Sequence, residues 1–301
     1  MPQFGTFLVV GGDSLVGSHT IRVLKQRGHR VLASTRRPET VGDRRVLLDF
    51  ENPECFRLPE GVDYVFVIAA ATNYERCETD PLARIINEEH IPRLVGNMLK
   101  QNAFVTFIST NSVFGGERPW PGENDPHDPR IAYARQKSAG ERIILEQAKL
   151  LGALDRLNIT RLTKVLSRTT SPLPTWLEAW ERGETIQPFA DLIFAPMSTI
   201  FVGNALADIG ERRIAQNLHL SGAENVNYVD LAYALAAKLG VDSRLVLPSS
   251  ARKKGVHIAF KPAYSGLDMR HTTALTGIIP QSLKQVVDDI FADVEEKDFV
   301  I

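Results

Sequence analysis

The sequence predicts an α/β protein with a doubly wound parallel sheet in its first half and a smaller α+β region in its second half. Short apolar runs alternate with segments whose apolar residues recur at helical spacing, and the first run ends in a glycine-marked turn. Strands and helices that alternate through short connections build a parallel sheet with helices on both faces. This alternation stops at about residue 163, where a different organisation begins.

The elements of the first half follow from these periodicities. Apolar runs predict six strands, at residues 6–10, 30–34, 45–48, 62–71, 103–109 and 156–162. The run at 62–71 is apolar enough to indicate a strand that is buried on both faces. Helical spacing predicts helices at residues 15–28, 81–101 and 130–151.

The second half is interrupted by prolines and carries two tryptophans among short isolated elements. Residues 227–239 and 281–295 are still expected to form amphipathic helices, so this half is predicted to be folded rather than a linker. Trp176 and Trp180 stand one helical turn apart, a spacing typical of core packing. Together with Phe189 they are alternatively candidates for stacking on a ligand.

Composition and charge limit the partners. The 301 residues carry a formal net charge of -1, which gives no electrostatic reason to expect a nucleic acid or a membrane surface as partner. The two cysteines, Cys55 and Cys77, fit no metal-ligand spacing and are expected to be free thiols in a reducing compartment. Neither a signal-peptide pattern nor a membrane-spanning apolar run is recognisable, so a cytoplasmic location and a small-molecule ligand are expected.

The turn after the first strand has the pattern Gly11-x-x-Ser14-x-x-Gly17. Gly11 permits a sharp turn, Gly17 allows the helix to pack on the strand, and a helix beginning at Leu15 would offer its amide groups to a pyrophosphate. A generic strand-to-helix turn is the alternative, because Ser14 replaces the middle glycine of the usual fingerprint. The pattern predicts a Rossmann-like dinucleotide-binding domain at residues 1–165. Residues 166–301 are then mainly a substrate-binding region, packed on the first and partly interleaved with it.

Arg36 and Arg37 follow the second strand, at the place where an NAD-binding chain carries an acid for the ribose hydroxyl. A guanidinium there suits a 2′-phosphate, which favours NADP(H) while leaving NAD(H) possible. A solvated surface pair is the alternative. Asp49 and Phe50, after the third strand, are candidates for contact with the adenine, although an ordinary turn aspartate is nearly as plausible.

Tyr133 and Lys137 are four residues apart and therefore share one face of the predicted helix at 130–151. A lysine beside a tyrosine favours the phenolate, so Lys137 is expected to lower the pKa of Tyr133. Beside a nicotinamide cofactor such a pair can carry out carbonyl reduction. An exposed helix pair without a catalytic role is the alternative.

These motifs occur in one order along the chain, which resembles the extended short-chain dehydrogenase/reductase family. The turn and Asp49 are followed by Ala69-Ala70-Ala71, Asn87, a Ser-Thr-Asn-Ser-Val-Phe-Gly segment at 109–115, and Tyr133-x-x-x-Lys137 with Gly140-Glu141. The chain looks most similar to the branch of dTDP-4-dehydrorhamnose reductases and related sugar-nucleotide epimerases and dehydratases. The resemblance is dense over residues 5 to 165 and thin beyond them.

The resemblance implies a role for each matching residue. Thr110 would bind the substrate carbonyl, Tyr133 would donate the proton, and Lys137 would hold the nicotinamide ribose. Ala69, Ala70 and Ala71 would lie at the cofactor, and Asn87 would assist the lysine through water. Thr110 as a strand-end cap and Asn87 as an ordinary helix residue are the alternatives.

The family's pattern is not complete in this chain. The rhamnose-reductase branch usually has aspartate where Asn111 stands, and its arginine and tryptophan pattern is not clearly reproduced after Arg161. The sugar substrate is therefore expected to differ. Four basic residues of the second half are candidates for a diphosphate, with a solvated face as the alternative for each: Arg182, Lys253, Lys254 and Lys261.

The sequence predicts an NADP(H)-dependent reductase that acts on a keto group of a nucleotide-linked sugar without a metal. A sugar-nucleotide epimerase or dehydratase is the second hypothesis, and Arg36 and Arg37 weigh against it because epimerases tend to hold NAD tightly. A non-catalytic dinucleotide-binding regulatory subunit is the third, and the intact set of Thr110, Tyr133 and Lys137 weighs against it. A homodimer is possible, since pairing through the helix of Tyr133 is usual in the family.

Overall fold

A seven-stranded parallel sheet forms the centre of the molecule in the computed structural model, which describes residues 5–292 apart from the side chain of Cys55. Its strand order is β10-β6-β5-β4-β1-β2-β3, and every neighbouring pair is parallel. The strands are β1 (Thr6–Val10), β2 (Arg30–Thr35), β3 (Arg45–Leu47), β4 (Tyr64–Val67), β5 (Phe104–Thr110), β6 (Leu157–Leu162) and β10 (Asn217–Leu220). The order reverses direction at β1, as in a doubly wound sheet, so the predicted fold class is confirmed.

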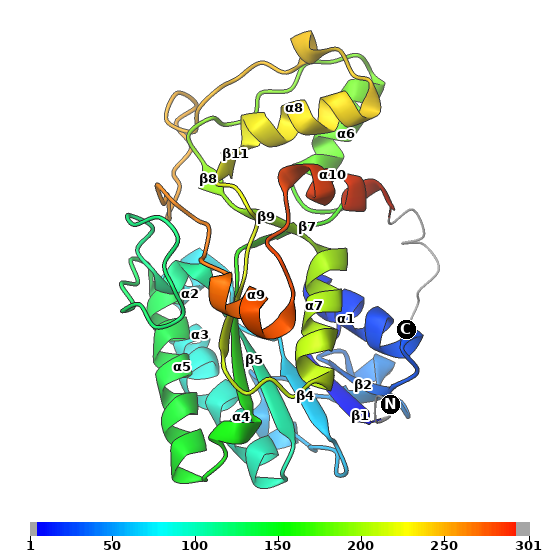
Figure 1. Ribbon diagram of the computed structural model, residues 1–301, viewed down its shortest axis with the longest axis vertical. Helices are drawn as coiled ribbons and strands as arrows, with labels where there is room; N and C mark the ends of the chain where they lie inside the picture. The colour runs from blue at the N-terminus through cyan, green and yellow to red at the C-terminus, as the bar shows by residue number, and fades with distance from the viewer. Residues whose placement is uncertain (1–4, 293–301) are drawn as a thin grey trace.

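Helices cover both faces of this sheet (Figure 1). One face carries α2 (Tyr74–Thr79), α3 (Pro81–Ile85), α4 (Ile91–Lys100) and α5 (Ala132–Leu150). The other face carries α1 (Leu15–Gln26) and α7 (Thr199–Glu211), which lie side by side. Apolar side chains of α4 and α5, among them Leu94 and Ile144, form one core with the sheet, and those of α1 and α7, among them Leu24 and Leu206, form the other.

The predicted strand at 62–71 is wrong at its carboxyl end, because β4 stops at Val67. The backbone of Ala71 is instead bound by the side chain of Asn87, whose Oδ1 accepts from the Ala71 N–H at 3.0 Å and whose Nδ2 donates to the Ala71 carbonyl at 2.9 Å. Asn87 belongs to a π-helical turn, Ile86–His90, that joins α3 to α4 within the predicted helix at 81–101. Residues 68–72 are thus held out of the sheet as a loop.

The strand β10 and the helix α2 are additions to the predicted elements. β10 pairs with β6 at the edge of the sheet, with Leu220 opposite Leu162, and α7 packs against α1. Both β10 and α7 come from beyond residue 165. This stretch of chain therefore completes the sheet and one of its helical faces.

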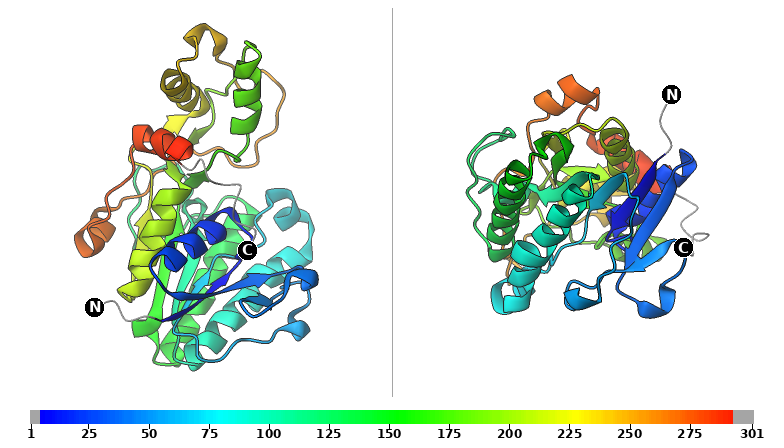
Figure 2. Two further views of the ribbon diagram at one scale, coloured as in Figure 1. Left: turned by 90° about the vertical axis from the view of Figure 1, so that its right-hand side faces the viewer. Right: turned by 90° about the horizontal axis from the view of Figure 1, so that it is seen from below.

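A smaller lobe stands beyond the carboxyl ends of the strands (Figures 1 and 2). Its helices are α6 (Leu173–Glu181), α8 (Tyr228–Leu239) and α10 (Leu283–Ala292), while α9 (Arg270–Thr276) lies lower, near the sheet. Its strands pair as β7 (Lys164–Leu166) with β9 (Pro196–Ser198), and β8 (Ile193–Phe194) with β11 (Val226–Asn227). α10 is described as far as Ala292, so residues 293–295 of the predicted helix lie outside the described residues.

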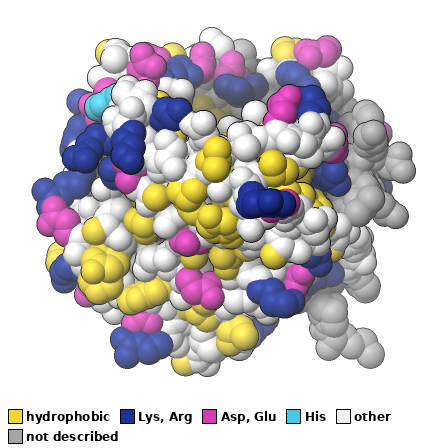
Figure 3. Space-filling model, turned by 90° about the horizontal axis from the view of Figure 1, so that it is seen from above, with side chains coloured by type: hydrophobic (Ala, Val, Ile, Leu, Met, Phe, Trp, Pro, Cys, Tyr) yellow, Lys and Arg dark blue, Asp and Glu magenta, His cyan; other side chains and the backbone are white. Residues whose placement is uncertain are grey.

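Trp176 and Trp180 are buried in the core of this lobe, against side chains of α8 and α10 such as Leu235 and Val286. They are packing residues, which settles the alternative between packing and ligand stacking. Seen from the end of the molecule that carries this lobe, basic and acidic side chains are interspersed among apolar ones (Figure 3). None of the helices formed by residues 5–292 is both long and apolar enough to cross a membrane.

Candidate active site

The glycine-marked turn connects β1 to α1 as the sequence predicts. Gly11 has a φ of +93°, and a Cβ on it would lie 2.7 Å from the backbone nitrogen of Ala69. A Cβ on Gly17 would lie 2.2 Å from the carbonyl oxygen of Gly11, so the helix can approach the turn only with glycine here. Ser14 caps α1, because its Oγ accepts from the Gly17 N–H at 3.1 Å and donates to the Gly11 carbonyl at 2.7 Å. Serine therefore replaces the middle glycine without disturbing the turn.

A groove of about 290 Å³ runs over this turn and along the carboxyl ends of β1 to β4. Most of the predicted cofactor residues line it: Gly11, Ser14, Arg36, Asp49, Phe50, Ala69, Ala70 and Ala71. Leu15 and Gly17 stand behind the lining, as the first residues of the helix whose amino terminus faces the groove. The close approach of backbone to backbone at Gly11, the small alanine side chains and the helix amino terminus together fit a dinucleotide.

Arg36 and Arg37 differ in their surroundings. Arg36 lines the groove and has no hydrogen-bond or ion-pair partner among residues 5–292. Arg37 pairs with Asp13 at 3.2 Å, and Asp13 also contacts Arg45 and accepts from the Thr35 hydroxyl at 2.9 Å. These partners lower the pKa of the Asp13 carboxyl although its burial opposes this shift. Asp13 therefore remains an anion at the edge of the groove, paired with both Arg37 and Arg45.

Asp49 and Phe50 line the groove but have structural contacts as well. The Asp49 carboxylate accepts from the Glu51 N–H at 3.1 Å and from the Asn52 side chain at 2.7 Å, as an ordinary turn aspartate does. The Phe50 carbonyl accepts a hydrogen bond from His90 at 2.7 Å. Both carboxylate oxygens of Asp49 thus serve the turn while its side chain borders the groove, and contact with the adenine stays a prediction.

Asn87 is buried, and within residues 5–292 its side chain makes no hydrogen bond with Lys137. Besides binding Ala71, its Nδ2 donates to Gln136 Oε1 at 2.9 Å, and Gln136 donates to the Cys77 carbonyl at 3.0 Å. The amide thus holds the loop 68–72 that forms one wall of the groove. Cys77 is a free thiol, as expected, and lies buried next to this loop.

Thr110 and Tyr133 meet at the carboxyl end of β5. Both side chains line a second cavity, and the Thr110 hydroxyl is near enough to the phenol to oppose the rise in the pKa of Tyr133. The Thr110 Oγ1 also accepts from the Ser112 N–H at 3.2 Å, so the strand-end cap is present in addition to the contact with the phenol. The ring of Tyr74 packs beside that of Tyr133 with centroids 5.4 Å apart.

Lys137 is buried, with 3% of its surface exposed, so the alternative of an exposed helix pair is wrong. Its Nζ donates to the Ile108 carbonyl at 2.8 Å and lies 3.9 Å from the centre of the Phe107 ring. Burial lowers the pKa of Lys137 to about 7, with Glu141 opposing the shift. Burial also raises the pKa of Tyr133 well above its ordinary value.

The expectation that Lys137 lowers the pKa of Tyr133 is therefore wrong for the protein without its ligands. The lysine is itself desolvated, and its ammonium is directed to a backbone carbonyl, so the penalty of placing a phenolate in the interior dominates. A raised pKa keeps the phenol protonated through neutral pH, which is the state that a proton donor requires.

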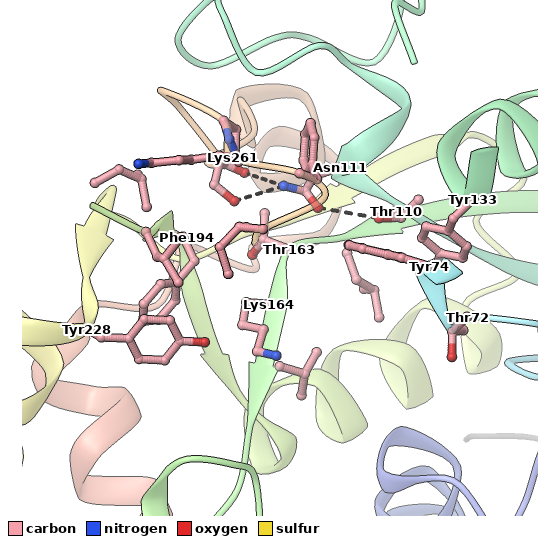
Figure 4. A pocket seen from close by; sticks show the side chains of 18 residues that line it. Thr72, Tyr74, Thr110, Asn111, Tyr133, Thr163, Lys164, Phe194, Tyr228 and Lys261 are labelled. Atoms are coloured by element: carbon pink, nitrogen blue, oxygen red, sulfur yellow. Dashed lines mark hydrogen bonds between the residues drawn. The ribbon is translucent and has the colours of Figure 1, made fainter. Parts of the chain in front are cut away.

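The second cavity has a volume of about 530 Å³ and lies between the sheet and the smaller lobe. Thr72 lines both this cavity and the groove, so the two spaces meet beside Thr110 and Tyr133. Figure 4 shows Thr72, Tyr74, Thr110 and Tyr133 at one end of the view and Phe194 and Tyr228 at the other. Asn111 donates to the backbone carbonyl and the hydroxyl of Ser265 at 2.9 Å each, which attaches the end of β5 to the far wall.

The sequence did not indicate most of this cavity. Lys164, Phe194 and Tyr228 line it from β7, β8 and α8. Among the basic candidates Lys261 lines it, paired with Asp191 at 2.7 Å, whereas Arg182 pairs with Glu184 elsewhere on the surface. Lys253, Lys254 and Phe189 are absent from the lining. The one available signal was the position of Thr163 and Lys164 just past β6, since ligands bind outside the carboxyl ends of parallel strands.

Comparison with known families gives a match over residues 5–296 to the model described as the RmlD substrate binding domain. The chain belongs to this family. Its members are NAD(P)-dependent oxidoreductases of the extended short-chain dehydrogenase/reductase type, so the resemblance and the enzyme class predicted from the sequence are confirmed.

Curated relatives match over nearly the full chain. A Streptomyces antibioticus protein named probable dTDP-4,6-dihydroxy-2-methyloxan-3-one 4-ketoreductase is 27% identical, with 95% of this chain and 96% of the relative covered. The spore coat polysaccharide biosynthesis protein SpsK of Bacillus subtilis is 26% identical, with 87% and 89% covered.

Solved structures share the fold. A dTDP-4-dehydrorhamnose reductase from Clostridium acetobutylicum superimposes with a TM-score of 0.79 at 20% identity, covering 95% of this chain and 98% of the other. The dTDP-4-dehydrorhamnose reductase of Bacillus anthracis, solved in complex with NADP, has a TM-score of 0.79 at 19% identity, covering 96% and 99%.

Proposed function

We propose that this protein is an NADP(H)-dependent reductase that converts a keto group of a nucleotide-linked sugar into a hydroxyl group, with Tyr133 as the proton donor. The observation that carries the proposal is the placement of Thr110 and Tyr133 together in the cavity lining, near Thr72, which lines both the groove and the cavity. A keto group held there would face the cofactor groove on one side and a protonated phenol on the other.

The cofactor half of the proposal rests on the groove. Its turn, its alanine wall and the unpaired Arg36 suit a dinucleotide with a 2′-phosphate, and the NADP complex of the Bacillus anthracis relative agrees with this preference. When bound, the nicotinamide supplies the hydride. Gly11, Ser14 and Leu15 would hold the pyrophosphate, and Arg36 the 2′-phosphate.

The residues of the cavity would then complete the reduction. The Thr110 hydroxyl and the Tyr133 phenol would both donate hydrogen bonds to the keto oxygen, which polarises the carbonyl bond. As the carbonyl carbon gains the hydride, its oxygen takes the Tyr133 proton and becomes the hydroxyl group. The phenolate left behind is stabilised by Lys137 in its charged form and regains a proton from solvent.

The substrate half of the proposal rests on the cavity and the relatives. A volume of about 530 Å³ is within the range of small-molecule sites, and the lining extends from Thr110 and Tyr133 to Phe194 and Tyr228, where a nucleotide would lie beyond the sugar. The Streptomyces antibioticus relative is named as a 4-ketoreductase of a dTDP-sugar, the chemistry that we propose here.

Oxidation of NADPH in the presence of a dTDP-4-keto-6-deoxysugar tests the proposal, with Tyr133→Phe as the diagnostic variant. We expect Tyr133→Phe to bind NADPH like the wild type and to lose about 10²–10⁴-fold in turnover, since only the donated proton is removed. Tyr233→Phe is the matched control, because Tyr233 is exposed on α8 and does not line the cavity. Turnover by Tyr133→Phe at the wild-type rate would refute Tyr133 as the donor.

A further inference from the structure

We propose that Lys164 forms an anion-binding subsite in the substrate cavity, which receives an oxyanion group of the substrate next to the reacting sugar. The inference rests on the proposed function and specifies its substrate. The chemistry that Lys164 selects is a negatively charged oxygen, carried either by the diphosphate or by a carboxylate on the sugar ring.

The position of Lys164 follows from the sheet. In the register of β5 and β6, Thr110 lies opposite Leu162, and the chain continues through Thr163 to Lys164 at the start of β7. With a rise of about 3.3 Å per residue, the Lys164 backbone is roughly 7 Å beyond that pair. In the view of Figure 4 the Lys164 side chain lies between Tyr228 on one side and Thr110 and Tyr133 on the other. An ammonium group there can reach groups attached to the ring whose keto oxygen contacts Tyr133.

The charge balance of the cavity is positive. Its lining contains Lys164 and Lys261 and no aspartate or glutamate. Lys261 is neutralised by its 2.7 Å ion pair with Asp191, whose carboxylate also accepts from the Ala251 N–H at 2.8 Å. The side chain of Lys164, in contrast, makes no hydrogen bond or ion pair with any residue from 5 to 292. A bound anion would supply the negative charge that no protein group near the Lys164 side chain provides.

The cavity walls also affect the ionisation of Lys164. They displace water around its side chain and lower its pKa below the ordinary value, with no neighbouring carboxylate to oppose the shift. Part of the Lys164 surface is exposed to solvent, so a ligand that enters the cavity can reach its ammonium group. Lys149 at the end of α5 is also exposed but does not line the cavity, which makes it a matched control.

The test measures ligand binding to the NADP⁺-saturated protein by calorimetry for the wild type, Lys164→Met, Lys164→Arg and the control Lys149→Met. The ligands are thymidine, dTDP, dTDP-glucose and dTDP-glucuronic acid, which add the diphosphate, the sugar and the carboxylate in turn. We expect Lys164→Met to lose at least about tenfold in affinity for the ligand that carries the recognised anion, as for other charge-assisted hydrogen bonds. Lys164→Arg should restore most of it, while thymidine binding and Lys149→Met stay unchanged.

The pattern of losses identifies the source of the anion. Equal losses for dTDP and dTDP-glucose assign the subsite to the diphosphate, and a loss confined to dTDP-glucuronic acid assigns it to a ring carboxylate. Wild-type affinities for all four ligands in Lys164→Met would overturn the inference, even if that variant still reduces a keto sugar and so leaves the proposed function intact.

If the wild type binds none of these nucleotides, the proposed function fails and inorganic pyrophosphate becomes the probe. Binding of pyrophosphate that Lys164→Met abolishes would then support the subsite, and binding that it leaves unchanged, or no binding to the wild type, would overturn it.

Discussion

Burial determines the ionisation of the central side chains at the scale of single residues. It raises the pKa of Tyr133 and lowers that of Lys137 to about 7, so both groups are driven toward their neutral forms. The phenol therefore retains the proton that the proposed reduction would consume. Lys137 can gain or lose its charge near neutral pH and can respond to the charge that develops on Tyr133.

The lowered pKa of Lys137 predicts a pH-dependent stability. The unfolded chain holds this proton up to its ordinary pKa of about 10.4, whereas the folded protein releases it above about 7. Between these values the unfolded state binds more protons, so this lysine makes the free energy of unfolding rise with pH, by up to about 1.4 kcal/mol per pH unit.

Lys137→Met should therefore be most stable relative to the wild type at pH 6 and should lose this advantage progressively toward pH 9. Urea unfolding across this range measures the difference, and Lys149→Met, at an exposed site on the same helix, should show no such trend. A difference between Lys137→Met and the wild type that stays constant with pH would contradict the burial argument.

Arg36 and Arg37 predict the cofactor preference. Because Arg36 lines the groove without a partner, Arg36→Ala should weaken NADPH binding by roughly 10–100-fold and NADH binding much less. Arg37 is already paired with Asp13, so Arg37→Ala should add a smaller loss. Fluorescence titration with both nucleotides measures the effect. Equal losses for NADPH and NADH in the double variant would show that neither arginine binds the 2′-phosphate.

At the scale of elements, the loop after β4 depends on a single amide. Asn87→Ala would leave the buried N–H of Ala71 unpaired and its carbonyl with only the weak Cys77 thiol as donor, at a cost of roughly 1–3 kcal/mol. The loop forms a wall of the groove, so NADPH affinity should fall together with the free energy of unfolding. Asn97→Ala, at an exposed site on α4, is the matched control. If the two variants behaved alike in urea unfolding and NADPH titration, the loop would not depend on Asn87.

The elements of the first half could be predicted because each has a local pattern. β1, β2 and β5 are mostly apolar runs of five to seven residues, and the turn at Gly11 to Gly17 contains its glycines in one short segment. β10 was missed because His219 interrupts its apolar run. That histidine is buried and is bonded to Arg161 at 3.2 Å and to the Asp268 carbonyl at 3.1 Å, partners that no local pattern reveals.

The residues of the candidate site could likewise be predicted from the sequence only in part. Most of the residues that line the groove could be predicted to lie together, since they follow consecutive strands of a recognisable motif. The cavity was not, because Lys164, Phe194 and Tyr228 come from segments far apart in the sequence and meet only through the packing of the smaller lobe. The ionisation of Tyr133 was also misjudged, since spacing places it near Lys137 but does not reveal that both are buried.

At the scale of the whole molecule, the groove and the cavity lie across the carboxyl ends of the sheet, so ligand binding should stabilise the entire fold. A ligand present at 100 times its dissociation constant raises the free energy of unfolding by about 2.7 kcal/mol. We expect NADPH to raise the melting temperature more than NADH does at equal concentration. A melting temperature that neither nucleotide changes would indicate that the groove does not bind a dinucleotide, and would favour a non-catalytic member of the family.

The most direct test of the central claim is the transfer of deuterium from NADPH labelled at the nicotinamide C4 to a dTDP-4-keto-6-deoxysugar, followed by mass spectrometry of the sugar. A reductase that acts as proposed places deuterium on the new carbinol carbon in step with the oxidation of the cofactor, and Tyr133→Phe suppresses both. A sugar product that is altered but carries no deuterium from the added cofactor would contradict the reductase and point to an epimerase or a dehydratase.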